Sequence, residues 1–169
     1  MSDGLGSHDP AVVSRHVQAS PAAVWSVLAD GWLYATWVVG TSRVRAVDAN
    51  WPALGSKIHH SFGLWPAVID DTSEVLRTAP EREMLLKARG WPAGEAHVKL
   101  MLQPAGEGAT LVSVQEDVVA GPALAMPRPL RQLLVVPRNR EALARLAYIA
   151  EGRSHPLAGA PPRASRTAT

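Results

Sequence analysis

The sequence predicts an α+β domain in which one curved antiparallel sheet of seven strands surrounds a long C-terminal helix. Three observations support this prediction. After Gly40 the chain becomes a series of segments with apolar residues at every second position, which is typical of strands with one buried face. The gaps between these segments are short, so neighbouring strands must pair antiparallel. The last apolar part of the domain, residues 130–151, has helical spacing instead.

The N-terminal part of the domain is expected to form one strand and two short helices. Residues 11–19 are rich in β-branched side chains and alternate in polarity. In the next segment Ser20 can cap a helix, and Pro21 occupies the first helical position, where a proline loses no hydrogen bond. We expect Gly31 to end this helix in the left-handed conformation. The aromatic segment 30–40, DGWLYATWVVG, then forms the second short helix.

Six further strands are expected after these helices. Apolar and polar residues alternate in each of them, and every gap contains glycine or proline, the residues that favour turns. The expected strands span residues 42–49, 56–62, 67–78, 82–89, 95–102 and 109–118.

A proline-rich connection and a terminal helix complete the domain. Three prolines in residues 121–129 exclude another strand there. Pro137 interrupts the helical pattern of residues 130–151, so the best-defined helix is 138–151, preceded by a turn or a kinked segment.

The two ends of the chain have a different composition from the domain. Residues 1–10 are polar, and residues 153–169 are rich in proline, alanine and arginine, so we expect a disordered N-terminus and a disordered basic tail. The domain of strands and helices described above is therefore expected within residues 11–152.

Composition limits the kinds of partner and chemistry. The chain of 169 residues has a formal net charge of only +2 and no cysteine, which excludes disulfides and thiolate metal sites and fits a cytoplasmic location. The polar residues 1–10 lead us to expect no secretory signal, and the sequence has no apolar run long enough to span a membrane. We expect no nucleic-acid partner, no integral membrane association and no cofactor. No feature of the sequence specifies an oligomeric state.

Four motifs indicate a family. They are ASPAAVWSVLAD after the first strand, HHSFGLWPAVIDD across the third and fourth strands, RGWPAGEA at a hairpin, and PRNREALARLAYIAEG at the end of the domain. In these motifs and their order the chain resembles the START-like superfamily, also called SRPBCC, and its bacterial polyketide cyclase/dehydrase branch. The resemblance implies the helix-grip fold, β-α-α-β6-α. It also implies a mostly apolar cavity for lipids, polyketides, sterols or aromatic compounds, in which some members catalyse cyclisation or dehydration and others only bind.

Few polar residues are expected to face such a cavity. By period-two parity, His60 and Glu116 share a face with the apolar residues of their strands. Segment 67–78 fits either parity, so either Asp70 or Asp71 joins them. A buried carboxylate needs a partner, and a histidine–carboxylate pair could act as general acid and base on an enolisable ketone. These four residues are candidate catalytic groups, with a structural or ligand-orienting role as the alternative. The adjacent residues His59 and His60 point to opposite faces, so we expect no metal site.

Apolar side chains supply the candidate ligand contacts. Seven of the nine aromatic residues fall within residues 25–65, and large rings with one polar atom suit the partly hydrated mouth of a cavity. Packing between helix and sheet is the alternative for each ring. The candidate ligand-binding residues are Trp32, Trp37, Ile58, Phe62, Trp65, Met84, Leu86, Val98, Leu100, Val112, Val114, Met126 and Leu134.

The sequence thus favours a protein that binds a small hydrophobic molecule, such as a lipid, a polyketide or an aromatic compound, between the sheet and the C-terminal helix. The alternative is a cyclase/dehydrase-type enzyme acting on a polyketide-like substrate. That alternative requires His60 to face the cavity within hydrogen-bond distance of a carboxylate. A third hypothesis is an interaction protein that uses the outer face of the sheet or the basic tail.

Overall fold

The elements follow one another in the order that the sequence predicts. The structure is a computed structural model, and it describes residues 10–63, 65–90 and 94–154. The elements are β1 (Val12–Val17), α1 (Pro21–Leu28), the 3₁₀ helix η1 (Gly31–Leu33), α2 (Tyr34–Trp37), β2 (Thr41–Val47), β3 (Lys57–Phe62), β4 (Ile69–Ala79), β5 (Glu83–Gly90), β6 (Gly94–Pro104), β7 (Thr110–Ala120), the 3₁₀ helix η2 (Pro122–Ala125) and α3 (Arg128–Ser154).

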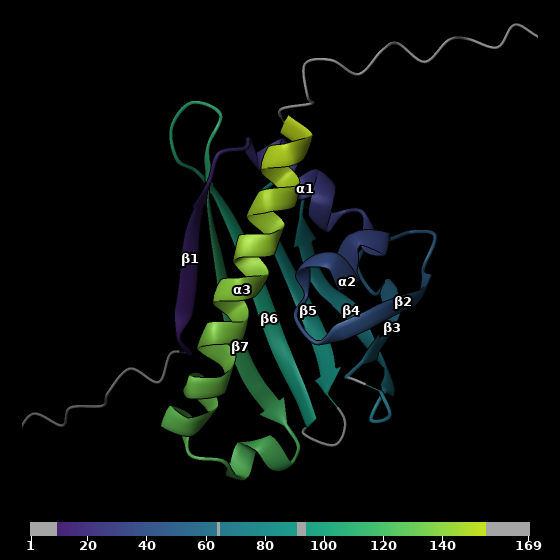
Figure 1. Cartoon of the computed structure of the whole chain (residues 1–169). Coiled ribbons are helices and arrows are strands. Elements are labelled where there is room, and N and C mark those ends of the chain that lie inside the picture. Colours follow the sequence, from purple (N-terminus) through teal and green to yellow (C-terminus); the bar gives the residue numbers. More distant parts are fainter. Residues whose placement is uncertain (1–9, 64, 91–93, 155–169) are drawn as a thin grey trace, which may run out of the picture.

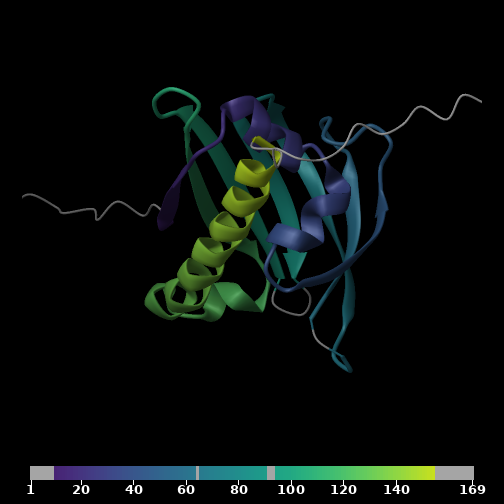
Figure 2. The ribbon, with the colours of Figure 1, turned by 45° about the horizontal axis from the view of Figure 1, so that its top comes forward.

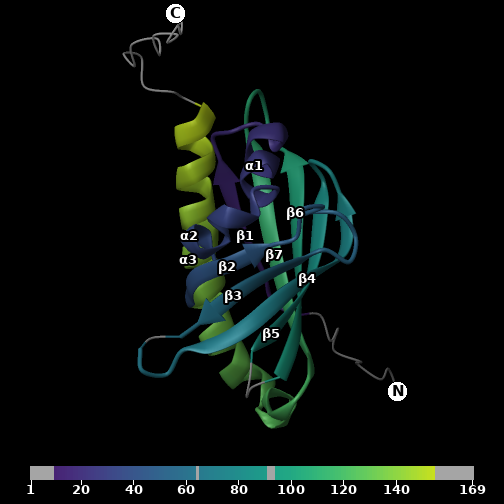
Figure 3. The same ribbon diagram turned by 90° about the vertical axis from the view of Figure 1, so that its right-hand side faces the viewer.

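All seven strands form one antiparallel sheet in the order β1-β7-β6-β5-β4-β3-β2. The six strands after α2 form a meander, and β1 pairs with β7, so that the first and last strands are neighbours. Figures 1 and 3 show α3 lying across one face of the sheet, with α1 beside its C-terminal half. In Figure 2 the sheet curves behind α3 from β1 at one edge to β2 at the other. This is the helix-grip architecture.

Local sequence signals explain where α1 begins but not where it ends. The Ser20 hydroxyl accepts a hydrogen bond from the Ala23 N–H at 3.2 Å, as an N-cap does. The helix ends at Leu28, followed by a cap residue in the right-handed conformation, so the predicted left-handed ending at Gly31 is wrong. Gly31 instead begins η1, where a Cβ would lie 2.7 Å from a methyl group of Val47. Close packing, rather than backbone conformation, requires glycine there.

The hydrophobic core lies at one end of the sheet, between its inner face, α1 and the C-terminal half of α3. Val24, Val27 and Leu28 of α1 are buried there. From α3 the buried side chains are Leu143, Leu146, Ala147 and Ala150. Within the described ranges, no helix is both long and apolar enough to cross a membrane.

Helix α3 is longer than predicted at both ends. It runs from Arg128 to Ser154 through Pro137, because a proline removes one helical hydrogen bond without forbidding the helix on either side. The predicted tail therefore begins too early: Arg153 is helical and donates hydrogen bonds to Asp30 Oδ2 at 3.2 Å and to the Ser26 carbonyl at 3.3 Å. Residues 1–9 and 155–169, which hold the rest of the predicted disordered ends, lie outside the described residues.

One strand departs from the predicted alternation. Regular alternation would place Val44 and Ala46 together on the inner face of β2, but Ala46 is exposed, and Val47 packs against the core instead. The pairing of β2 with β3 shifts between Val44 and Ala46. A bulge of this kind adds one residue and reverses the side-chain parity beyond it.

Candidate functional site

A cavity of about 320 Å³ lies between the inner face of the sheet and the N-terminal half of α3. Trp37 and Phe62 line it from one side, and Leu86, Val98 and Val114 line it from the central strands. Small-molecule sites typically measure about 300–1,000 Å³, so this volume is large enough for a small ligand.

Seven of the predicted ligand contacts line this cavity. They are Trp37, Phe62, Leu86, Val98, Val114, Met126 and Leu134. Parity placed the strand residues among them correctly on the inner face of the sheet.

The other six predicted contacts do not line the cavity, for two reasons. Ile58, Met84, Leu100 and Val112 are at most 1% exposed and belong to the core, because their ends of the strands are covered by α1 and the C-terminal half of α3. Trp32 is 61% exposed and Trp65 is 88% exposed, so both of these rings face solvent. Strand parity determines the face of a sheet but not which half of that face is hollow.

The short helix α2 brings two other rings to the cavity. Tyr34 and Trp37 are both buried and pack edge to face, with ring centroids 5.5 Å apart. Both line the cavity. Tyr34 was not among the predicted site residues, although it stands between the two tryptophans that were.

A buried chain of hydrogen bonds joins three elements at the cavity wall. The Tyr34 hydroxyl lies 2.7 Å from Ser73 Oγ on β4, and the same oxygen lies 3.1 Å from His60 Nε2 on β3. The rings of Tyr34 and His60 also pack together, with centroids 5.1 Å apart. All three residues are buried and line the cavity. They form a hydrogen-bonded polar patch on an otherwise mostly apolar wall.

Burial keeps both titratable members of this chain uncharged. It lowers the pKa of His60 below the ordinary value of 6.5, although the nearby carboxylate of Asp71 opposes the shift. Burial likewise raises the pKa of Tyr34 to about 12. At neutral pH the cavity therefore presents a neutral imidazole and a protonated phenol.

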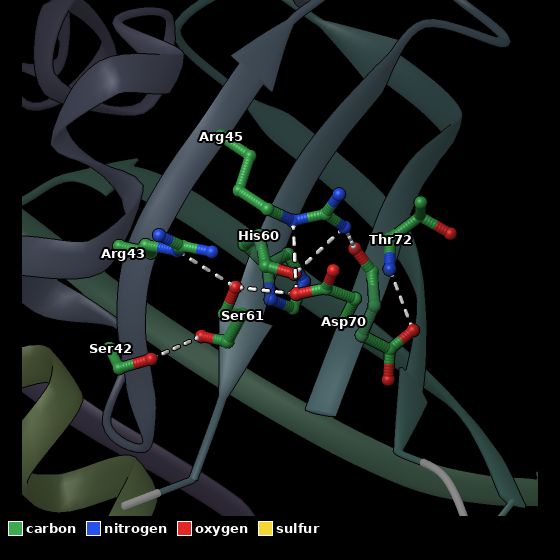
Figure 4. A network of polar contacts seen from close by, with 8 residues as sticks. Ser42, Arg43, Arg45, His60, Ser61, Asp70 and Thr72 are labelled. Atoms are coloured by element: carbon green, nitrogen blue, oxygen red, sulfur yellow. Dashed lines mark hydrogen bonds and ion pairs between the residues drawn. The ribbon is translucent and has the colours of Figure 1, made fainter. Parts of the chain in front are cut away.

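The structure resolves the parity of β4. Asp71, Ser73 and Val75 are buried on the inner face, whereas Asp70 points to the outer face. There Asp70 Oδ1 accepts a hydrogen bond from Ser61 Oγ at 2.7 Å and lies 3.3 Å from Arg45 Nε, as Figure 4 shows. Asp70, a candidate catalytic residue, is therefore outside the cavity.

Asp71 is on the expected face but does not pair with His60. The two residues lie opposite each other in the β3–β4 ladder. Asp71 Oδ1 accepts a hydrogen bond from the Thr72 N–H at 2.6 Å, and Asp71 is not part of the cavity wall. Among the described residues, neither Asp71 Oδ2 nor His60 Nδ1 has a hydrogen-bond partner. The predicted histidine–carboxylate hydrogen bond is therefore absent from the described residues, and Ser73 takes its place.

Glu116 faces the cavity as predicted, and a cation from α3 neutralises it. Its side chain is 7% exposed and forms an ion pair with Arg138, which is 36% exposed. The sequence held a signal for this pair, since an inward glutamate needs a cation or a hydrogen-bond donor. The predicted helix 138–151 contains Arg138, but its pairing with Glu116 depends on how the helix packs against the sheet.

Metal ligation has no support in the part of the chain that the structure describes. Its histidine and acidic side chains form no group of three or more that could hold a metal ion.

A curved antiparallel sheet around a C-terminal helix, with a mostly apolar cavity between them, defines the START-like class of proteins. Within that class, the chain belongs to the family described as polyketide cyclase/dehydrase and lipid transport, whose family model matches residues 11–151. A search of curated proteins finds no relative.

Solved structures with the same fold come from several bacteria. The Zhui aromatase/cyclase from Streptomyces sp. R1128 is 18% identical with a TM-score of 0.68, over 89% of this chain and 98% of that one. A protein from Rhodobacter sphaeroides is 23% identical with a TM-score of 0.65, over 86% and 95% of the two chains. A START superfamily protein from Mycobacterium smegmatis is 18% identical with a TM-score of 0.61, over 87% and 97%. These similarities establish the shared fold.

Proposed function

We propose that this protein binds a small hydrophobic molecule, such as a lipid, a polyketide or an aromatic compound, in the cavity under α3. The observation that supports this function is the mostly apolar wall around about 320 Å³ of space. Transfer of apolar ligand surface from water to such a wall contributes roughly 25 cal/mol per Å². The preformed shape reduces the entropy lost on binding.

The experiment is titration with an apolar fluorescent dye, followed by displacement with fatty acids, polyketides and flavonoid-like aromatics. Val98→Trp places a large ring on the cavity wall, and Val119→Trp makes the same change on the exposed side of β7 as a matched control. We expect Val98→Trp to weaken dye binding by about tenfold or more, the equivalent of at least roughly 1.4 kcal/mol, with both variants folded by circular dichroism. Equal dye binding by the two variants, or no dye binding by the wild type, contradicts the proposal.

A second candidate function is catalysis of cyclisation or dehydration on a polyketide-like substrate. Because His60 has no carboxylate partner among the described residues, the acid–base pair is not proposed; the neutral His60 at the cavity wall supports a version in which the imidazole alone accepts a proton from the carbon beside a ketone. Membership of a family that includes cyclases and dehydrases supports it as well.

Deuterium exchange at the α-carbon of an apolar aryl ketone in D₂O, followed by mass spectrometry, tests this chemistry. The wild type should accelerate the exchange, and His60→Gln should abolish the acceleration while dye binding persists. Exchange at the uncatalysed rate with wild-type protein rejects the catalytic function and leaves ligand binding intact.

A further inference from the structure

Among the described residues of the cavity wall, positive side chains outnumber negative ones by one. Within the described residues, the arginine and acidic side chains that line it are Arg89, Glu95, Glu116, Arg131 and Arg138. Arg89 pairs with Glu95 at 3.0 Å, and Arg138 pairs with Glu116. Arg131 is the cation that remains, and burial keeps His60 neutral.

Arg131 lies in the first turn of α3, and its side chain has no hydrogen-bond partner among the described residues. Its Nε is buried and has no partner, and its guanidinium makes no hydrogen bond or ion pair with any residue that the structure describes. Glu116 and Asp117 border a smaller neighbouring hollow together with Arg131, yet neither pairs with it. A buried donor without a partner costs free energy, so the site favours an external acceptor.

Arg131 lies near the rim of the cavity. Leu134, one turn further along α3, also lines the cavity but is 60% exposed, which places this part of the helix at the rim. The wall formed by Trp37, Leu86 and Val98 lies on the sheet side and on α2. A ligand with a charged head group at the rim and an apolar body inside matches both Arg131 and this apolar wall.

We propose, building on the binding function above, that the ligand is an amphipathic carboxylic acid whose carboxylate pairs with Arg131. A guanidinium presents parallel N–H groups that match the two oxygens of a carboxylate. One uncompensated cation matches the single negative charge of a carboxylate better than a phosphate monoester, which carries about −1.5 to −2 at neutral pH.

The test compares decanoic acid with decan-1-ol, which have the same apolar chain and differ in the head group. Affinities are measured by displacement of the apolar dye at pH 7.5, where the acid is ionised. The variants are Arg131→Met and, as a matched control, Arg140→Met, an exposed arginine on the same helix that does not line the cavity. Circular dichroism checks that each variant is folded.

We expect the wild type to bind the acid about tenfold or more tightly than the alcohol. Arg131→Met should remove this preference by weakening acid binding alone, Arg131→Lys should retain part of it, and Arg140→Met should leave it unchanged. Equal affinities of the wild type for acid and alcohol, or an unchanged preference in Arg131→Met, overturn the carboxylate proposal while the binding function stands. Failure of the wild type to bind the dye, the acid and the alcohol overturns the binding function itself.

Discussion

Two buried serines on neighbouring strands allow a direct measurement of the polar chain at the cavity wall. Ser73 and Ser61 are both 0% exposed, but Ser73 points inward and Ser61 points outward. Replacing Ser73 by alanine leaves the Tyr34 hydroxyl and His60 Nε2 without their shared partner, and both residues are buried. Each unsatisfied buried group costs about 1–3 kcal/mol, so Ser73→Ala should destabilise the protein by about 3 kcal/mol.

The same substitution at Ser61 should cost much less. Ser61 donates to Asp70 and accepts from Arg43. The Asp70 side chain is 60% exposed and Arg43 is also exposed, so both can bond to water instead. A hydrogen bond whose partners return to water contributes about 1 kcal/mol. We therefore expect Ser61→Ala to cost about 1 kcal/mol or less.

Urea unfolding followed by tryptophan fluorescence measures both free energies of unfolding. At this chain length, 1 kcal/mol corresponds to about 2–4 °C in Tm, so Ser73→Ala should lower Tm by about 6–12 °C. In a double-mutant cycle, Tyr34→Phe should cost less in the Ser73→Ala background than in the wild type, because the hydroxyl has already lost its partner. A loss for Ser73→Ala no larger than that for Ser61→Ala refutes the prediction that the Tyr34 hydroxyl and His60 Nε2 are left without a hydrogen-bond partner.

Two further predictions concern the charges of the site. Because burial lowers the pKa of His60, the unfolded chain takes up its proton first as the pH falls below about 6.5, and the folded state loses stability from there down to the folded-state pKa. His60→Gln should therefore reduce the difference in unfolding free energy between pH 7.5 and pH 5, measured by urea titration; an unchanged difference argues against a depressed pKa. For the ion pair, Arg138→Met leaves the nearly buried Glu116 without its cation and should lower the free energy of unfolding by about 2–3 kcal/mol. Glu116→Gln leaves a partly exposed guanidinium instead and should lower it by about 1 kcal/mol or less. Equal costs in urea unfolding at pH 7.5 contradict this asymmetry.

On β3, β6 and β7, alternation along the strand was sufficient to predict which side chains point toward α3. His60, Val98, Val114 and Glu116 all follow from period two, because successive side chains of a regular strand point to opposite faces of the sheet. Alternation could not separate Ile58, which is in the core, from these residues. That distinction depends on how far α1 and the C-terminal half of α3 reach over the sheet, which is a property of tertiary packing.

The polar chain was harder to predict, for a different physical reason. Strand β4 carries polar residues on both faces, so its pattern alone could not show that Ser73 points inward. Tyr34 lies in a helix of four residues, too short for a helical pattern to define a buried face. Trp32, two residues earlier and of similar size, faces solvent. The choice between these rings is made by the hydrogen bond to Ser73 and by contact with His60.

The two halves of helix α3 have different surroundings. Its C-terminal half carries the buried Leu143, Leu146 and Ala150, while its N-terminal half carries Arg131 and the largely exposed Leu134. Substitutions near Arg131 can consequently alter ligand preference at little cost to folding, because surface changes usually shift stability by less than about 0.5 kcal/mol. One continuous helix thus joins a half that stabilises the core to a half whose side chains can be changed with little loss of stability, so folding and the character of the cavity rim can be altered separately.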